Sequence, residues 1–280
     1  MFIPDSYIDE LIASDISSGI DLTTHVLGIG DKPGRMEYYT RDDALLCGAE
    51  EAKRVFDRFG CTVTNMKPSG AWLDAGSTFM TVEGPAAGLH MGWKICLNIF
   101  EYYCALATKA KKMVDIVHAV NPRCGVLTTR KLMPGTKPLD TKALTLGGAF
   151  PHRLGLSETV LVFDHHLTFY GGMDKFIEDM PLIKAKTCEK KLFVEAGVED
   201  APRLVEAGVD GIQLDKVPAD EVARLVPQLK AISPRVTLIA AGGVNLKNAA
   251  EYAATGVDGL ATTCLHSANP LDMSVRMIAL

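Results

Sequence analysis

The first ninety residues carry two different hydrophobic rhythms. Two segments, DELIASDI (9–16) and DALLCGAEEAKRVFDRFG (43–60), place apolar residues at helical spacing, and Gly60 ends the second. Other segments alternate apolar and polar residues and carry turn residues, as strands do. They are GRMEYYTR (34–41), CTVTNMKPSG (61–70) and STFMTVEGPAAGLHMG (77–92). The pattern predicts a small α+β domain, followed by a long apolar-striped helix over residues 92–120.

From residue 125 onward, short apolar runs recur and helical segments lie between most of them. Strands that alternate with helices imply βαβ units and a parallel sheet. Six such units are too few for the usual eight-stranded barrel of about 250 residues. An open doubly wound sheet and an incomplete barrel therefore both remain, and we place the two domains at residues 1–110 and 111–280. The runs are GVLTTR (125–130), TVLVFD (159–164), KLFVEA (191–196), GIQLDK (211–216), TLIAAGG (237–243) and GLATTC (259–264).

Composition narrows the class of protein. The net charge of −5 argues against the clustered basic surplus that nucleic-acid binding requires. Seven scattered cysteines form no C-x-x-C pair, which favours reduced thiols over a disulfide framework or a thiolate zinc site. The N-terminus lacks the features of a secretory signal, and no uncharged apolar run approaches the roughly 18 residues of a membrane span. We therefore expect a soluble, cytoplasmic protein without nucleic-acid or membrane partners.

Charged and small residues follow directly after the predicted strands. Ligands bind at the carboxyl ends of the strands in parallel α/β folds, so these residues are expected to share one pocket. For any single residue, the alternative is a strand end that is polar only because it faces solvent. The mixture suits an anionic substrate, a divalent cation and a phosphate group. The residues are Arg130, Lys131, Asp164, His165, His166, Glu195, Asp215, Lys216, Gly242, Gly243, Thr262 and Thr263.

Basic residues gather in TTRKLMPGTKP (128–138) and FPHRLGL (150–156). Arginine presents a planar fork that suits a carboxylate or phosphate, and lysine adds a point charge. Because Arg130 directly follows a predicted strand, we favour a substrate-binding cluster over a solvated loop. The cluster consists of Arg130, Lys131, Lys137, His152 and Arg153.

The acids Glu195 and Asp215 end consecutive predicted strands, so their carboxylates can approach each other. Such oxygen ligands suit Mg²⁺ held jointly with substrate phosphates or ribose hydroxyls. The alternative is that each acid pairs with a nearby lysine such as Lys216. The segments IAAGGVN (239–245) and TTCLHS (262–267) place small residues before helices, where free N–H groups bind phosphate.

A transition-metal site at Asp164, His165 and His166 is disfavoured. We expect these residues at the end of an extended strand, where neighbouring side chains point to opposite faces. Both imidazoles would then not reach one ion. A histidine coupled to the basic substrate pocket is the favoured interpretation.

The segment TTRKLMPGTKPLDTKALTLGGAFPHRLGLSETVLVFDHH (128–166) resembles the signature region of the quinolinate phosphoribosyltransferases, the carboxylating nicotinate-nucleotide pyrophosphorylases. The resemblance covers nearly the whole chain and extends to SDISSGIDLTT (14–24), LLCGAEEAKRVF (45–56) and VEGPAAGLHMGWKICLNIFEYYCALAT (82–108). The tetrapeptide QLDK (213–216) is similar to the ModD-like subgroup, pyrophosphorylases encoded with molybdenum transport functions.

This resemblance implies an N-terminal α/β sandwich domain and a C-terminal open α/β barrel. It also implies a homodimer, or a higher oligomer, whose active sites take residues from both subunits. In the family reaction the pyridine nitrogen attacks C1 of 5-phosphoribosyl-1-pyrophosphate while Mg²⁺ steadies the departing pyrophosphate. The quinolinate adduct then loses CO₂ and gives nicotinate mononucleotide for NAD biosynthesis. No covalent enzyme intermediate is needed, so positioning and charge stabilisation are the protein's tasks.

The resemblance also assigns roles to individual residues. Arg130 and Arg153 match the arginines that hold the pyridine carboxylates, and Lys131 and His152 complete that pocket, with Lys131 among the catalytic residues. The catalytic acids that serve the ribose and the metal are Glu195 and Asp215, the pocket wall includes His166, and the 5′-phosphate region contains Gly242, Gly243, Thr262, Thr263 and His266.

Four positions depart from the family pattern. Lys94 stands where the family carries an arginine that reaches into the partner's site, and Phe163 replaces a lysine. Ala241 replaces a serine, and Thr263 replaces a glycine, in the phosphate region. We therefore expect phosphoribosyl pyrophosphate chemistry to be retained with quinolinate or a related aromatic N-heterocyclic acid as the acceptor, and one alternative is a ModD-like homologue with an altered acceptor. Another alternative is a protein of this fold that binds a phosphate or oxyanion without turnover in a molybdenum-related role; an unrelated barrel enzyme fits least.

Overall fold

The computed structural model describes residues 1–16 and 19–280; positions 17 and 18, within the segment SDISSGIDLTT, lie outside the described residues. The chain forms two compact units. The N-terminal unit contains Met1–Lys111, Met133–Gly147 and Ser267–Leu280, and the C-terminal unit contains Lys112–Leu132 and Gly148–His266. The predicted division at 110/111 lies one residue from the first crossing. The structure differs in returning two later segments to the N-terminal unit.

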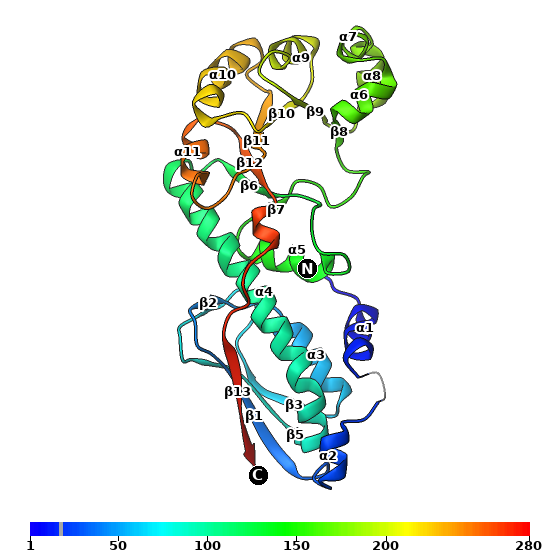
Figure 1. Ribbon diagram of the computed structural model, residues 1–280, viewed down its shortest axis with the longest axis vertical. Coiled ribbons are helices and arrows are strands. Elements are labelled where there is room, and N and C mark those ends of the chain that lie inside the picture. The colour runs from blue at the N-terminus through cyan, green and yellow to red at the C-terminus, as the bar shows by residue number, and fades with distance from the viewer. Residues whose placement is uncertain (17–18) are drawn as a thin grey trace. The chain divides into compact units, whose positions relative to one another are not determined.

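An antiparallel sheet with the strand order β13-β1-β5-β3 lies at the centre of the N-terminal unit (Figure 1). Burial alternates along β1, so that Met36, Tyr38 and Thr40 face the interior. The last strand, β13, pairs with β1 from Gly34 to Thr40 and thereby ties the C-terminal segment to this unit. The strands are β1 (Pro33–Thr40), β3 (Thr62–Met66), β5 (Thr78–Pro85) and β13 (Met273–Ala279), with β2 (Ala44–Leu45) and β4 (Trp72–Leu73) in a separate ladder.

Aromatic side chains fill the space between this sheet and its helices. Tyr38 and Phe79 meet Phe100 edge to face, with ring centroids 5.2 Å and 4.9 Å apart. The Tyr38 hydroxyl donates to the carbonyl oxygen of Trp93 at 2.9 Å, which satisfies the one polar group in this cluster. The helices are α1 (Asp5–Asp15), α2 (Leu22–Val26), α3 (Ala49–Arg58), α4 (Ala86–Val120) and α5 (Lys137–Leu146); α4 includes the helix predicted over 92–120.

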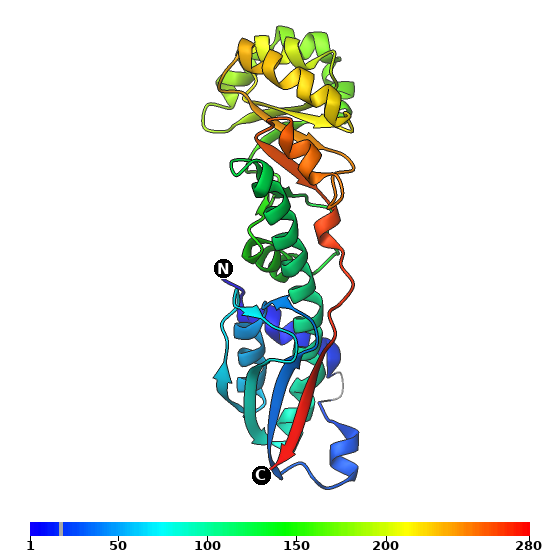
Figure 2. The ribbon, with the colours of Figure 1, turned by 90° about the vertical axis from the view of Figure 1, so that its left-hand side faces the viewer.

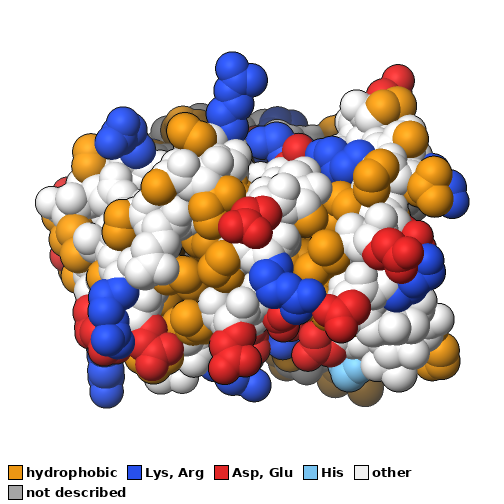
Figure 3. Space-filling model, turned by 90° about the horizontal axis from the view of Figure 1, so that it is seen from above, with side chains coloured by type: hydrophobic (Ala, Val, Ile, Leu, Met, Phe, Trp, Pro, Cys, Tyr) orange, Lys and Arg blue, Asp and Glu red, His pale blue; other side chains and the backbone are white. Residues whose placement is uncertain are grey.

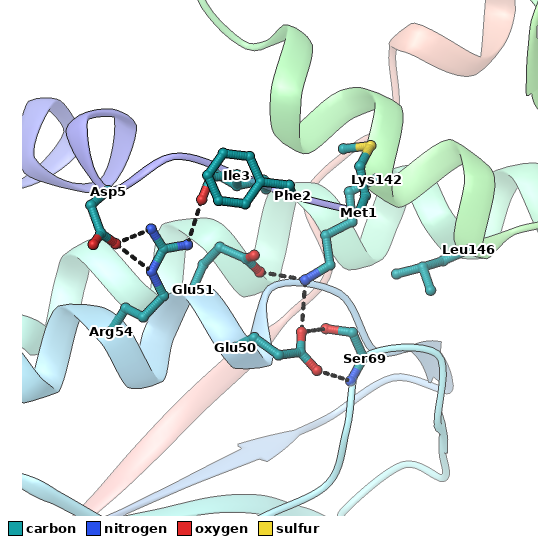
Figure 4. A pocket seen from close by; sticks show the side chains of 10 residues that line it. All are labelled: Met1, Phe2, Ile3, Asp5, Glu50, Glu51, Arg54, Ser69, Lys142 and Leu146. Carbon is teal, nitrogen blue, oxygen red and sulfur yellow. Dashed lines mark hydrogen bonds and ion pairs between the residues drawn. The ribbon is translucent and has the colours of Figure 1, made fainter.

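A buried ion cluster fastens α5 to α3 (Figure 4). The Lys142 Nζ lies 2.7 Å from Glu50 Oε2 and 2.5 Å from Glu51 Oε2. Burial alone would raise the pKa of Glu50, but hydrogen bonds from Lys142 and Ser69 outweigh it and hold the pKa at about 2. Burial alone would lower the pKa of Lys142, and its two carboxylate partners raise it instead. Lys142 and Glu50 are therefore both charged at neutral pH.

The C-terminal unit contains a seven-stranded parallel sheet with the order β7-β6-β12-β11-β10-β9-β8. Strands β8 to β12 follow one another in sequence order, and β6 and β7 continue the sheet beyond β12. Every pairing between neighbours is parallel. The strands are β6 (Gly125–Thr128), β7 (Phe150–Pro151), β8 (Val160–Val162), β9 (Leu192–Ala196), β10 (Gly211–Asp215), β11 (Thr237–Ala241) and β12 (Gly259–Thr262).

The helices of this unit lie on one side of the curled sheet (Figures 1 and 2). One-sided helices and a sequential strand order are features of a barrel, whereas a doubly wound sheet has helices on both faces. The structure thus resolves the open choice in favour of an incomplete barrel. The helices are α6 (Asp164–Tyr170), α7 (Met173–Glu178), α8 (Met180–Lys186), α9 (Ala201–Ala207), α10 (Ala219–Ile232), α11 (Ala249–Ala254) and the 3₁₀ turn η1 (Cys264–His266).

The sequence GVDG occurs at residues 208–211 and 256–259, and its aspartate makes the same kinds of hydrogen bond in both copies. In the first copy, Asp210 accepts hydrogen bonds from the backbone N–H of Leu192 and from Lys184, both at 2.7 Å. In the second copy, Asp258 accepts from the N–H of Leu238 at 2.7 Å and from Lys230 at 2.8 Å. Each aspartate therefore joins the start of a neighbouring strand to a preceding helix.

Charges of both signs are interspersed with hydrophobic side chains over the face seen in Figure 3. Among the described residues, no helix combines the length and the hydrophobicity of a membrane-spanning segment.

The buried ion cluster yields a stability prediction for Lys142. Replacing it by Met leaves Glu51, whose side chain is 4% exposed, buried without its cation. We expect Lys142→Met to lower the free energy of unfolding by about 3–5 kcal/mol. Trp72 and Trp93 both belong to the N-terminal unit, so urea unfolding followed by tryptophan fluorescence reports on this unit.

The matched control is Lys53→Met, which removes an exposed helical ion pair with Asp57. Its expected cost is below about 0.5 kcal/mol. Equal losses in the two variants would show that the Lys142 cluster does not stabilise the unit.

Candidate active site

The parallel sheet of the C-terminal unit brings the predicted site residues to one edge. Glu195 is the penultimate residue of β9 and Asp215 is the last residue of β10. Gly242 follows β11 directly, and Thr262 ends β12. Arg130 lies two residues beyond the end of β6. Because all these strands run in the same direction, their carboxyl ends meet at the same edge.

Side chains on one face of this sheet are polar at the edge and apolar below it. Glu195 and Gln213 are partners in the β9–β10 register, and Asp215 lies two residues after Gln213, so these three side chains share a face. Below them, a cluster of apolar side chains forms the floor. It consists of Leu161, Phe193, Ile239, Ala241 and Ala261, with Leu127 and Phe163 packed against it.

Glu195 lies in a crowded electrostatic environment. Burial raises its pKa, a hydrogen bond from Gln213 opposes the rise, and the carboxylates of Asp215 and Asp164 add to it. Lys131 lowers the pKa in turn. Glu195 is therefore surrounded by Asp164 and Asp215, with Lys131 as a nearby cation, which places the predicted acid pair and the predicted catalytic lysine together.

Arg130 and Arg153 form the basic part of the same unit. Neither guanidinium pairs with a carboxylate of the residues that the structure describes. Burial lowers the pKa of Arg153, and the positive charge of Arg130 lowers it further. Two arginines that repel each other without a protein counter-ion are suited to an anionic ligand.

The segment after β8 differs from the prediction. Asp164, His165 and His166 begin helix α6 and do not end a strand, because β8 stops at Val162. The His166 Nδ1 accepts a hydrogen bond from the backbone N–H of Phe163 at 2.9 Å and so caps the helix. The prediction that these residues end a strand is therefore wrong, and strand alternation does not decide whether they share a metal. The position of His166 is explained by its cap on the helix.

Phe163 lies between a cation and an imidazole. Its ring stacks on that of His166 with centroids 5.8 Å apart, and the Arg153 guanidinium carbon lies 5.9 Å from its centroid. Phe163 also packs on the apolar floor. The position thus supplies an aromatic surface next to Arg153.

His152 is held neutral beside this floor. Burial lowers its pKa, and Arg153 lowers it further. Its ring meets Phe193 edge to face at 6.1 Å, and its buried Nε2 has no hydrogen-bond partner among the described residues. A buried nitrogen without a partner is uncommon in folded proteins, so His152 is an exceptional feature of this floor.

The predicted phosphate region consists of a glycine loop after β11 and of residues that hold this loop in place. Gly242 and Gly243 have φ of 80° and 85°, and the carbonyl of Gly243 accepts hydrogen bonds from Asn245 and Asn248 at 2.8 Å and 3.1 Å. Thr262 is buried, and its hydroxyl donates to the carbonyl of Val244 at 2.6 Å.

The other two predicted phosphate residues also belong to this region. The His266 Nε2 lies 3.0 Å from the carbonyl oxygen of Thr129, and Thr263 is exposed. Thr262 and His266 therefore hold neighbouring loops together.

Lys94 belongs to the other compact unit. It is exposed on α4, and its Nζ lies 4.6 Å from the centroid of the Trp93 ring.

The acid pair fits Mg²⁺ better than a transition metal. Among the described residues, no three His, Cys, Asp or Glu side chains converge as metal ligands. The mutual repulsion of Glu195 and Asp215 is relieved by a divalent cation, and two carboxylates are the usual protein share of a Mg²⁺ site completed by substrate oxygens and water.

A cavity of about 570 Å³ lies in the N-terminal unit (Figure 4). None of the predicted site residues lines it. Its charged groups are engaged with one another, since Lys142 binds Glu50 and Glu51 while Arg54 pairs with Asp5. We therefore assign this cavity a structural role and place the candidate site at the sheet edge.

The sequence patterns missed Gln213 and Phe193. Gln213 donates to Glu195 Oε2 at 2.6 Å, and Phe193 forms the floor beneath that acid. A period of two from Asp215 back through GIQLD could have indicated Gln213.

Comparison with known proteins identifies related chains. The family model described as "Quinolinate phosphoribosyl transferase, C-terminal domain" matches residues 106–276, and the corresponding N-terminal domain matches 21–104. A protein of Pasteurella multocida, provisionally named pyrophosphorylase ModD, is 31% identical over 276 residues, which cover 98% of each chain.

Two further relatives support this comparison. A probable nicotinate-nucleotide pyrophosphorylase (carboxylating) of Archaeoglobus fulgidus is 30% identical over 243 residues, 85% of this chain and 92% of that protein. The crystal structure of NadC from Streptococcus pyogenes has the same fold, with a TM-score of 0.89, 22% identity and coverage of 100% of this chain and 99% of that one.

The loop after β11 yields a prediction that compares two adjacent glycines. A Cβ at Gly242 would lie 2.5 Å from the backbone nitrogen of Lys216 and 2.6 Å from Asp215 Oδ1, whereas a Cβ at Gly243 meets no atom within 4 Å. Both positions have positive φ, so each Ala substitution costs about 1–2 kcal/mol of backbone strain.

We expect Gly242→Ala to cost about 1–3 kcal/mol more than Gly243→Ala, because the added clash displaces Asp215 and Lys216. Urea unfolding followed by circular dichroism measures the two costs, and hydrogen exchange at the Lys216 amide, which donates to Ala241 at 2.8 Å, locates the damage. Indistinguishable variants would contradict the close approach at Gly242.

Proposed function

The chain belongs to the quinolinate phosphoribosyltransferase family, and we propose that it transfers the phosphoribosyl group of 5-phosphoribosyl-1-pyrophosphate to the ring nitrogen of an aromatic N-heterocyclic acid. The observation that carries the proposal is that one compact unit holds two arginines without a carboxylate partner among the described residues and, at the ends of neighbouring strands, the acids Glu195 and Asp215. The arginines suit an anionic acceptor, and the acids suit a donor that carries ribose hydroxyls and a metal ion.

The donor is assigned to the acids and the glycine loop. Glu195 and Asp215 accept hydrogen bonds from ribose hydroxyls and would hold Mg²⁺, with Lys131 beside them. When bound, Mg²⁺ neutralises charge on the diphosphate. The open space at Gly243 allows the 5′-phosphate to approach backbone N–H groups.

The acceptor is assigned to Arg130, Arg153 and His152. The arginines hold a ring carboxylate and orient the ring nitrogen toward C1 of the ribose, which supplies proximity. The N–C1 bond forms, the bond from C1 to the diphosphate oxygen breaks, and the electron pair leaves with pyrophosphate. With quinolinate, the bond from the ring carbon beside the nitrogen to its carboxylate then breaks with release of CO₂. The electron pair stays on that ring carbon, which takes up a proton from solvent to give nicotinate mononucleotide.

Phe163 supports an acceptor that differs from quinolinate. A phenyl ring next to Arg153 offers stacking surface and volume but no positive charge. An acceptor with one carboxylate and a larger apolar ring face suits two arginines and Phe163 better than a compact dianion does. Release of CO₂ is then not part of the reaction.

We also infer that the protein acts as a homodimer in the cytoplasm, with Lys94 of one subunit facing the site of the other. The resemblance of the WKICLN segment to the family's bridging helix and the exposure of Lys94 support this assembly.

A pyrophosphate-release assay tests the transferase. The protein is incubated with phosphoribosyl pyrophosphate and Mg²⁺ across pyridine monocarboxylates, pyridine dicarboxylates and fused-ring heterocyclic acids. We expect release with at least one acid, loss of release on chelation of Mg²⁺, and a drop of at least about 100-fold in kcat/KM for Arg153→Met. Binding of the donor without release for any acid would instead favour a non-catalytic ligand-binding protein.

The substitution Phe163→Lys tests acceptor choice. We expect it to raise kcat/KM for dicarboxylates relative to monocarboxylates by about 10-fold or more. The ammonium group of the introduced lysine would compensate the charge of the acceptor's second carboxylate. Phe169→Lys, at a residue 94% exposed on α6, the helix that follows Phe163, is the matched control and should leave the ratio unchanged. An unaltered ratio in Phe163→Lys would contradict the role of the phenyl ring.

A further inference from the structure

We infer that Gln213 is a positioning residue for the phosphoribosyl donor, whose buried amide fixes the Glu195 carboxylate and leaves one carboxylate oxygen for the ligand. The inference rests on the proposed function, because it names the residue that prepares the donor site. Gln213 is 8% exposed, and its Nε2 donates to Glu195 Oε2 at 2.6 Å.

The sheet determines this contact. Gln213 and Glu195 are register partners on the adjacent strands β10 and β9, so their side chains leave the sheet side by side on one face. An ionised carboxylate accepts hydrogen bonds only, which means that the amide must present its nitrogen to Glu195. The carbonyl oxygen of Gln213 consequently points elsewhere.

That carbonyl oxygen is accessible from the site. No described residue donates a hydrogen bond to Gln213 Oε1, and unlike His152 Nε2 it is not an enclosed atom without a partner. Glu195 is half-buried, so its second oxygen is also within reach. Gln213 Oε1, Glu195 Oε1 and Asp215 therefore offer acceptors suited to ribose hydroxyls.

A neutral donor suits the acidic surroundings of Glu195. Asp164 and Asp215 add negative charge near it, and the nearby cation, Lys131, is exposed. A hydrogen bond from a neutral amide stabilises the carboxylate without adding a counter-ion that would compete for the ligand. A lysine at position 213 would stabilise the negative charge of Glu195, but its ion pair with Glu195 would compete with the ligand.

Substitution by Met tests the inference, since Met keeps the length and volume of Gln without a hydrogen-bond donor. We expect Gln213→Met to raise KM for phosphoribosyl pyrophosphate about 10- to 100-fold with a smaller change in kcat. The matched control is Gln228→Met, at an exposed position on α10, with unchanged constants.

An unchanged KM for phosphoribosyl pyrophosphate in folded Gln213→Met would overturn the inference. If the wild-type protein shows no turnover with any acceptor, the proposed function fails, and calorimetric binding of Mg²⁺–phosphoribosyl pyrophosphate to the two proteins still tests Gln213. Weaker binding to Gln213→Met then supports the positioning role, and equal binding contradicts it.

A second variant covers poor folding of the first. Gln213→Glu keeps the shape of the side chain but replaces the N–H donor by a carboxylate oxygen, which cannot donate to an ionised Glu195. We expect it to weaken binding of Mg²⁺–phosphoribosyl pyrophosphate at least as much as Gln213→Met does. Unchanged binding in folded Gln213→Glu would count against Gln213.

Discussion

In a parallel sheet every strand delivers the residue that follows it to the same edge, and here seven strands do so in a curved array. The pairing of β9, β10 and β11 in fixed register carries Glu195, Asp215 and Gly242 to that edge. The same pairing places apolar residues beneath them, so the polar groups lie above an apolar cluster. A shift of one residue in the register of β9 or β10 would turn its acidic side chain to the opposite face of the sheet.

The edge carries charge that the protein neutralises only in part, since Asp215 Oδ2 lies 3.8 Å from Nζ of the exposed Lys216. Burial and its acidic neighbours disfavour the anion of Glu195, and burial and Arg130 disfavour the cation of Arg153. Elsewhere the chain pairs its partly buried charges closely, as at Lys142 with Glu51 and at Asp210 with Lys184. Incompletely compensated charge of both signs in one unit is therefore a specific feature of the strand ends, and perturbed ionisation of this kind marks functional sites.

Much of this arrangement could be predicted from the sequence. The alternation of short apolar runs with helices indicated the parallel sheet, and resemblance supplied the incomplete barrel that the period alone left open. Reading the strand ends indicated Arg130, Glu195 and Asp215, because polarity after an apolar run is a local signal.

Other features depend on contacts that a local pattern does not encode. β13 joins the N-terminal sheet from the end of the chain, and its partner β1 lies more than 230 residues earlier. The DHH segment was wrongly placed on a strand because its helix begins with a cap from His166 to Phe163, formed three residues apart. Gln213 was overlooked because its significance arises across two strands, in the bond to Glu195.

A crystal structure of the protein with phosphoribosyl pyrophosphate and Mg²⁺ tests the central claim most directly. The account predicts the ribose hydroxyls on Glu195 and Asp215, the metal between this acid pair and the diphosphate, and the 5′-phosphate at Gly242–Gly243. A donor bound away from the carboxyl ends of β9, β10 and β11, or a diphosphate held without the acid pair, would contradict it.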